Sequence, residues 1–251
     1  MSRRGHLLYQ CLGILAILFV WQVATLFFPP LVVPPIGTVL ETLLRVAASD
    51  GFLPIVGTTV FRLLAGLAIG IAIGAIVGLL SGLSDKWRDS FSPLISVFQS
   101  VPPVCWVVLA LVWFGFNGKP CIFIVAAASM PTVAINISHG VRSIDKDLLE
   151  MARLYDFSRK ERIFDVVLPS VKPYLASSLE MVVGGGWKLA VMGEVLTTAS
   201  GIGGEITKAR LNIEPDAIIA WAILLVVCSF LTSKLLVLLV RGKRRHRSCC
   251  G

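Results

Sequence analysis

Few residues in this sequence have the types and spacing that enzymes use for chemistry. The three histidines, His6, His139 and His246, lie at or beyond the ends of apolar stretches, and neither His-Glu-x-x-His nor Gly-x-Ser-x-Gly occurs. The cysteines have no metal-ligand spacing, and most fall in apolar runs where cysteine acts as a small hydrophobic residue. No Gly-x-x-x-x-Gly-Lys-Ser/Thr loop is present to hold the phosphates of ATP. The sequence therefore argues against an enzyme active site, a metal site and a bound cofactor in this chain.

Lys188 and Glu194 carry a stronger functional signal, because both fall inside one apolar stretch. At this spacing on a helix they point to different faces and cannot form a local pair. A charge at membrane depth costs about 2.5–3.5 kcal/mol on insertion scales, so each needs a partner on another helix, on a second copy of the chain or in a transported solute. A path that favours an anion and a buried pair between helices both satisfy this need. The candidates for such a path are Pro102, Pro103, Trp106, Trp187, Lys188 and Glu194.

These residues belong to a chain with the composition of a membrane protein. Of its 251 residues, 56% are hydrophobic and 15% are charged, and the mean hydropathy is +0.83. Soluble domains carry about 25% charged residues, and a helix needs about 20 apolar residues to cross the hydrocarbon core. Six such stretches predict an all-α membrane protein, with spans near 7–28, 56–83, 91–114, 120–140, 174–197 and 217–240.

The 23 Lys and Arg residues predict the orientation of the chain. Most of them lie at the N-terminus, in the segments after the second and fourth spans and in the C-terminal tail, which places both termini in the cytosol. This placement also argues against nucleic acid as the partner of a chain with net charge +8. The predicted order is a tail and first span in 1–30, an extracytoplasmic segment in 31–55 with an amphipathic interfacial helix at 38–48, a core in 56–240 and a basic tail in 241–251.

The second span carries a glycine at every fourth position. Gly66, Gly70, Gly74, Gly78 and Gly82 share one helix face, because residues at i and i+4 lie above one another. Small residues in such a stripe let two membrane helices approach closely. The stripe predicts tight helix packing and says nothing about what passes through the bundle.

The third span contains the sequence Val101-Pro102-Pro103. Proline removes a backbone donor and its ring meets the preceding turn, so this helix should be broken or strongly kinked. Broken backbone at membrane depth survives only inside protein or beside a wet cavity, and transporters use such breaks at their substrate sites. A simple packing kink is the alternative.

The predicted cytosolic segment 142–172 is far longer than a connection between two helices needs. It contains two helix starts of its own. Asp147 followed by Glu150 has capping-box spacing, and so does Ser158 followed by Glu161. The segment should therefore form two short helices.

The residues between and after these helix starts complete the predicted helix–turn–helix. Asp156 lies between the helices, and aspartate tolerates the left-handed conformation that a sharp turn needs. Leu168-Pro169 is expected to end the second helix. The apolar side chains available for docking a partner are Leu148, Leu149, Ala152, Tyr155, Ile163 and Phe164.

The spacing in this segment resembles the EAA loop of ABC importer permeases. The family pattern is Glu-Ala-Ala, three residues, Gly, nine residues and Ile-x-Leu-Pro. The matching residues here are Glu150, Met151, Ala152, Asp156, Val166, Leu168 and Pro169. Met151, Asp156 and Val166 depart from the pattern, and Asp156 stands at the glycine of the turn, but the spacing is kept. Further motifs resemble the nitrate/sulfonate/taurine branch over about residues 30–240, among them Gly193-Glu194-Val195 and Ser200-Gly201-Ile202-Gly203.

The resemblance implies a type I ABC importer permease-like bundle in the bacterial cytoplasmic (inner) membrane. Two copies of the chain would form the path, two ATPase subunits would bind ATP and Mg, and an extracytoplasmic solute-binding protein would deliver the solute. The loop from Asp147 to Pro169 would couple the bundle to the ATPase. The branch implies a small anion such as a sulfonate, taurine or nitrate. A thiamine-precursor or aromatic-acid substrate and an ATP-independent secondary transporter are the alternatives.

Overall fold

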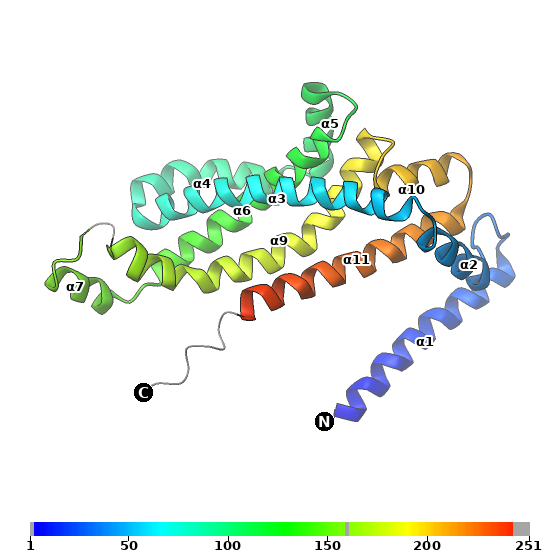
Figure 1. Cartoon of the computed structure of the whole chain (residues 1–251), viewed down its shortest axis with the longest axis horizontal. Coiled ribbons are helices and arrows are strands. Elements are labelled where there is room, and N and C mark those ends of the chain that lie inside the picture. Colours follow the sequence, from blue (N-terminus) through cyan, green and yellow to red (C-terminus); the bar gives the residue numbers. More distant parts are fainter. Residues whose placement is uncertain (1–2, 159–160, 243–251) are drawn as a thin grey trace.

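The computed structural model of the chain describes residues 3–158 and 161–242, and every regular element within them is a helix (Figure 1). The elements are α1 (Arg3–Phe27), α2 (Ile36–Ala47), α3 (Phe52–Leu83), α4 (Asp85–Ser100), α5 (Pro103–Phe114), α6 (Lys119–Arg142), α7 (Lys146–Leu154), η1 (Arg162–Val167), α9 (Leu168–Thr197), α10 (Ile202–Leu211) and α11 (Pro215–Gly242). The all-helical fold class predicted from the composition is confirmed.

Four stretches of the described chain are long and apolar enough to cross a membrane: α3, α6, η1 together with α9, and α11. A fifth candidate consists of α4 and α5, which are bent by 97° at the break between them. On α1, the described residues contribute a shorter apolar helix, Leu15–Phe27. Four or five of the predicted six spans are thus supported, and the span near 7–28 stays a prediction.

The break between α4 and α5 lies at the predicted proline pair. Val101 and Pro102 have extended backbone, with ψ angles of 125° and 138°. A residue that precedes proline is disfavoured in the helical region, and neither proline can donate a helical hydrogen bond. Across the break the rings of Phe98 and Trp106 stack, with centroids 4.7 Å apart. The predicted interruption of this helix is confirmed.

α3 lies against α6 along the stripe of glycines. A Cβ atom at Gly74 would stand 2.6 Å from the carbonyl oxygen of Met130 and 2.9 Å from the Cβ atom of Val133. The other members of the stripe, Gly66, Gly70, Gly78 and Gly82, meet residues of α6 in the same way. Because interiors are close-packed and a helix backbone cannot give way, any side chain here would separate the two helices.

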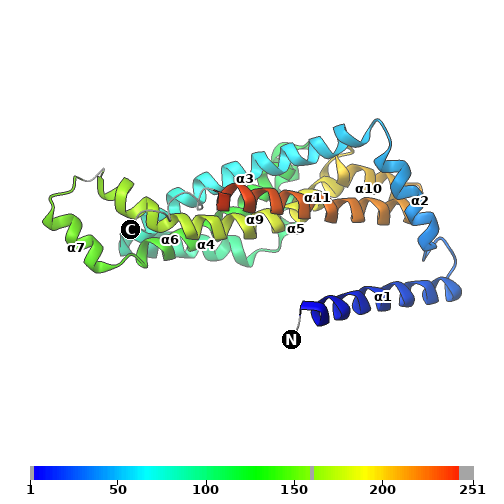
Figure 2. The same ribbon diagram turned by 60° about the horizontal axis from the view of Figure 1, so that its bottom comes forward.

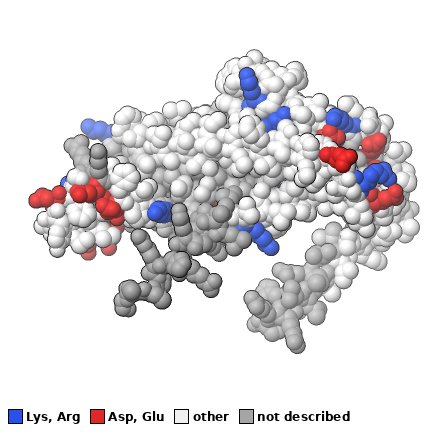
Figure 3. Space-filling model, viewed as in Figure 1, with Lys and Arg blue, Asp and Glu red and all other residues white. Residues whose placement is uncertain are grey.

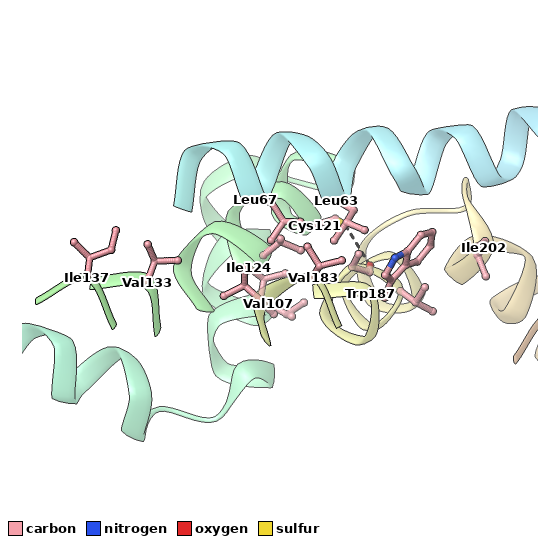
Figure 4. Packing of buried hydrophobic residues seen from close by; sticks show 14 of the residues in the cluster. Leu63, Leu67, Val107, Cys121, Ile124, Val133, Ile137, Val183, Trp187 and Ile202 are labelled. Atoms are coloured by element: carbon pink, nitrogen blue, oxygen red, sulfur yellow. Dashed lines mark hydrogen bonds between the residues drawn. The ribbon is translucent and has the colours of Figure 1, made fainter. Parts of the chain in front are cut away.

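The hydrophobic core lies where α3, α6 and α9 meet (Figure 4). Leu63 and Leu67 of α3 are almost completely buried beside Ile124 of α6 and Val183 of α9. Trp187 of α9 is 1% exposed, and its indole Nε1 donates a hydrogen bond to Thr232 Oγ1 of α11 at 2.8 Å. The largest buried ring therefore ties α11 to the three central helices.

The elongated bundle carries different helices at its two ends (Figures 1 and 2). α7 lies at one end, whereas α2 and α10 lie at the other. α1 extends away from the other helices in both views, and Trp21 Nε1 donates to the carbonyl oxygen of Pro34 at 3.1 Å. α2, the amphipathic helix predicted at 38–48, buries Val39 and Thr42, and Thr42 Oγ1 donates to Asp216 Oδ2 of α11 at 2.6 Å. This helix therefore packs on the start of α11.

Replacing Gly74 by alanine should destabilise the bundle by about 1–3 kcal/mol, because the new methyl group would meet backbone of α6. Gly57 is the matched control on the same helix, since nothing lies within 4 Å of a Cβ atom there. Gly57→Ala should be neutral or stabilise the helix by up to about 1 kcal/mol. Thermal unfolding of both variants in detergent checks this, and equal effects would contradict the packing assignment.

Candidate functional site

The short helix α7 is capped by an aspartate two positions earlier than the predicted cap at Asp147. The backbone amide of Asp147 donates to the carboxylate of Asp145 at 3.1 Å, and α7 already includes Lys146. Asp145 therefore occupies the capping position, and Asp147 lies in the first turn of the helix. Both carboxylates lie near the positive end of the helix dipole, where negative charge is stabilising. The predicted capping role of Asp147 is wrong, although the helix is where the sequence predicts it.

The turn after α7 has the conformation expected from the sequence. Asp156 has a φ angle of 49°, in the left-handed region. Ser158 and Glu161 then form a reciprocal capping box: the amide of Ser158 donates to the Glu161 carboxylate at 2.7 Å, and the amide of Glu161 donates to the Ser158 hydroxyl at 3.3 Å. Both the sharp turn and this second helix start are confirmed.

The predicted helix end at Leu168-Pro169 is wrong. The chain passes from η1 directly into α9, so a continuous helical stretch runs from Arg162 to Thr197. η1 is a π-helical turn just before Pro169. Its wider turn leaves room for the proline ring, which in a regular α-helix would meet the carbonyl group of Asp165. Pro169 thus stands near the start of α9 instead of ending the helix before it.

The end of the molecule around α7 exposes a cluster of apolar side chains. This α7 face consists of Leu148, Met151, Leu154, Tyr155, Ile163 and Phe164, and Leu154 and Phe164 are 84% and 64% exposed. Ala152, predicted as part of the docking surface, is 1% exposed and packs inward. The side chain of Leu149 lies outside the described residues. Asp and Glu side chains gather around the same end, at the left of Figure 3.

A cluster of buried polar residues, here called the Arg62–Glu194 knot, lies inside the bundle at the opposite half. Arg62 Nη1 of α3 donates to Glu194 Oε1 of α9 at 2.7 Å, and the Glu194 side chain is 0% exposed. Thr59 Oγ1 and the amide of Gly203 donate to Glu194 Oε2 at 2.9 and 3.0 Å. Arg62 also donates to the backbone oxygen and the hydroxyl of Ser200, at 3.0 and 2.7 Å. Every oxygen of the buried carboxylate therefore has a donor.

Glycines make the space that the knot occupies. A Cβ atom at Gly201 would collide with the Glu194 carboxylate, and one at Gly118 would collide with the Arg62 guanidinium. Gly201 also has a φ angle of 86°, which side chains rarely adopt. The sequence indicated that Glu194 needs a partner but not which one, because Arg62 lies in a different span. The Gly193-Glu194-Val195 and Ser200–Gly203 motifs are the sequence signal of this structure.

The structure brings together some of the predicted path residues and separates others. Pro103 and Trp106 line a cavity of about 340 Å³ at the bend between α4 and α5, together with residues of α6. Pro102 is exposed beside it. Trp187 is buried in the core, and Lys188 is exposed on α9. Glu194 belongs to the knot, so its partner is on another helix of the same chain.

The sequence places the chain in a known family. Residues 70–245 match the family described as binding-protein-dependent transport system inner membrane component. This span covers more than half of the chain and includes the α7 segment and the knot residue Glu194. The chain therefore belongs to this family, whose members are permease subunits of ABC importers, and the resemblance seen in the EAA-like loop is confirmed.

Individual relatives agree with this assignment. The chain is 29% identical over 228 residues to the taurine transport system permease protein TauC of Escherichia coli K12, covering 88% of this chain and 83% of TauC. It is 32% identical over 130 residues to the putative aliphatic sulfonates transport permease protein SsuC of the same organism, covering 52% of this chain and 49% of SsuC. It is also 32% identical over 111 residues to the nitrate import permease protein NrtB of Synechococcus elongatus, covering 44% and 40% of the two chains.

Solved structures share the fold at low sequence identity. A chain of the MetNI methionine ABC transporter, in an inward-facing conformation, superposes with a TM-score of 0.67 at 18% identity over 77% of this chain and 98% of that chain. A chain of a bacterial ABC transporter that imports alginate superposes with a TM-score of 0.61 at 17% identity over 98% and 100% of the two chains. These likenesses establish an ABC importer permease fold.

Replacing Glu194 by glutamine should cost about 3–5 kcal/mol of stability, because Arg62 would keep a buried charge without its counter-ion. The double variant Arg62→Leu/Glu194→Leu should lose less than the sum of its single variants. Lys208→Gln is the control, since its pair with Glu205 is partly exposed and contributes about 1 kcal/mol or less. Unfolding in detergent measures all of these, and additive losses would mean that the two side chains do not interact.

The helix start at Ser158 should depend on pH. Hydrogen bonds from Ser158 hold the pKa of Glu161 below its usual value. The hydroxyl of Ser158 is the larger cause and its backbone amide is the smaller one. The capping box is therefore fully formed above about pH 4.3, the ordinary pKa of glutamate, and is lost as the pH falls through the lowered pKa. Amide hydrogen exchange at Ser158, whose amide donates to the Glu161 carboxylate, should show this loss of protection after correction for the intrinsic rate. Glu161→Gln should remove the pH dependence, because it removes the titrating carboxylate, and its persistence would assign it to another group.

Proposed function

We propose that this chain is the transmembrane permease subunit of an ATP-driven importer that moves a small anion into the cell by alternating access. The observation that carries the proposal is the α7 face, an exposed apolar surface at one end of a bundle that belongs to the permease family. Large exposed apolar patches on a protein mark interaction sites. A separate ATPase that binds ATP and Mg is the partner proposed for this surface.

The connection between the α7 face and the bundle interior suits the transmission of motion. η1 carries Ile163 and Phe164 of the α7 face and continues without a break into α9. α9 has 30 residues, which corresponds to about 45 Å of helix. Glu194 lies near its far end, where the knot fixes it to α3 and to the start of α10. Closure of an ATPase dimer on the α7 face would therefore displace a helix that is anchored at the opposite half of the bundle.

The proposed solute is a small anion of the sulfonate, taurine or nitrate class. Support comes from the relatives, which include permeases named for taurine, aliphatic sulfonates, nitrate and bicarbonate. Taurine, sulfonates, nitrate and bicarbonate all carry an anionic oxygen group. A thiamine-precursor or aromatic-acid substrate remains the alternative within the same family. The selectivity of the importer would reside largely in a separate extracytoplasmic solute-binding protein.

The proposed assembly has two copies of this chain, two ATPase subunits and one solute-binding protein in the bacterial inner membrane. In the proposed topology, the chain has six spans and both termini lie in the cytosol. The segment around the α7 face is one of the Lys- and Arg-containing segments assigned to the cytosol, so the α7 face would lie on the same side as the ATPase. Apolar side chains exposed on α1, such as Leu15, Ile17 and Phe19, suit contact with lipid or with the second copy.

The test of this proposal is co-purification of the tagged chain from gently solubilised membranes. A P-loop ATPase should be recovered in about equal amount and should fall about tenfold or more when Met151 and Leu154 are replaced by arginine. Both side chains are exposed, so the bundle should still fold, whereas Ala152 is too buried for this purpose. Phe116→Arg is the control, because Phe116 is 84% exposed in the connection between α5 and α6.

Loss of the ATPase with Phe116→Arg as well would show that the assay reports general damage. Recovery of the chain without any ATPase, together with uptake that does not depend on ATP, would overturn the proposal.

A further inference from the structure

Two cavities follow one another in the groove between α4 and α6. The first has a volume of about 360 Å³, and most of its lining residues, which come from α3, α4 and α6, are polar. The second is the cavity of about 340 Å³ at the bend between α4 and α5. Gln99 lines both, so the two cavities adjoin. Together they are called the α4–α6 groove below.

The α4–α6 groove contains two polar side-chain atoms without partners. Among the described residues, Ser81 Oγ and Trp106 Nε1 are the buried side-chain nitrogen and oxygen atoms that have no hydrogen-bond partner. Ser81 is 3% exposed and lines the first cavity, whereas Trp106 lines the second. A buried polar group without a partner loses its hydration and gains nothing in return. Both of these atoms belong to residues that line one groove, which favours a polar ligand at this place.

The charges of the first cavity select an anion. Its lining includes Arg88, His139 and Arg142 and contains no carboxylate. Hydroxyl and amide groups complete its polar lining, from Ser81, Ser92, Ser96, Gln99 and Ser138. Guanidinium groups bind oxyanions through paired N–H donors, and hydroxyl groups supply neutral donors at low desolvation cost.

Two carboxylates that do not line the cavity form ion pairs with Arg88 and Arg142. Asp85 accepts from Arg142 at 2.8 Å and lies 3.4 Å from Arg88, and Asp89 also lies 3.4 Å from Arg88. Both carboxylates are more than two-thirds exposed, so solvent weakens their hold on the arginines. The arginines keep further N–H donors for a ligand in the cavity.

We infer that the α4–α6 groove binds a small free oxyanion, such as a sulfonate or nitrate, on its way through the bundle. In the first cavity, Arg88, Arg142 and the Ser81 hydroxyl bind the anion. In the second cavity, at the bend between α4 and α5, the Trp106 indole N–H donates a hydrogen bond to it. This inference rests on the proposed function for the identity of the bound anion as the transported solute.

The phosphate of an anionic lipid presents the same chemistry and is the other source of such a ligand. A lipid headgroup at a cytosolic basic pocket relies on charge near the membrane surface. The groove instead buries its hydroxyl at Ser81 and continues past Gln99 to the indole of Trp106. Neutral donors that continue into the bundle favour a small solute over a tethered headgroup.

The experiment measures thermal unfolding of the assembled chain in nanodiscs of zwitterionic phosphatidylcholine. Sodium methanesulfonate or nitrate is added up to about 10 mM, with chloride at equal ionic strength as the reference, because a ligand of the native state raises the midpoint. Ser81→Ala should weaken the anion-dependent shift, raising its half-effect concentration about tenfold, since a hydrogen bond to a charged ligand is lost. Trp106→Phe should weaken it as well, and Ser90→Ala is the control, since Ser90 is exposed on α4 outside both cavities.

The stability without anion separates a binding role from a structural one. Ser81→Ala should unfold at the same or a higher temperature than the parent chain when no anion is present, because it removes an unpartnered buried hydroxyl. A lower midpoint without anion, with an unchanged anion shift, would mean that Ser81 serves packing and would overturn the inference.

Three further outcomes would overturn the inference. They are the absence of an anion shift in the parent chain, an equal shift in Ser81→Ala, and a shift that appears only when phosphatidylglycerol replaces part of the phosphatidylcholine. The last would assign the groove to a lipid headgroup. If an ATPase co-purifies and drives uptake while any of these holds, only the groove assignment fails. If no ATPase co-purifies, the proposed function fails, although the anion shift still measures the groove itself.

Discussion

The contact between α3 and α6 depends on glycine, because the backbone atoms of α6 occupy the space that side chains of α3 would need. At Gly74 a methyl group would already meet the Met130 carbonyl oxygen. This close approach brings Leu63 and Leu67 of α3 against the core residues of α6 and α9. It also carries Thr59 and Arg62 of α3 to the position where they meet Glu194.

The Arg62–Glu194 knot and the α7 face occupy the two ends of one long helical stretch. η1 and α9 run without a break from Arg162 to Thr197. At one end, exposed apolar side chains suit a protein partner, and at the other, a fully hydrogen-bonded ion pair holds the helix in place. In the proposed function, docking of a partner at one end of this helix would move a helix that is fixed at its other end. The π-helical turn at η1 keeps this element continuous through Pro169.

Much of this architecture could be predicted from local sequence patterns. The glycine period, the Pro102-Pro103 break and the Ser158–Glu161 capping box each depend on residues close together in the chain, and the structure has each of them. Local patterns gave a wrong prediction where two local features compete to set the start or the end of a helix. Asp145 caps α7 in place of Asp147, and a π-turn lets the helix continue where proline usually ends one.

The sequence by itself determined the class of the protein, its apolar helices and the spacing of its EAA-like segment, because hydrophobic period, glycine and proline act within a few residues. Only the tertiary structure decided which distant residues meet. It paired Glu194 with Arg62, left Lys188 exposed outside the cavity that Trp106 lines, and placed Ser81 and Trp106 along one groove. The physical reason is that a buried polar group is satisfied by whichever helix packs beside it, and packing partners are set by the whole bundle.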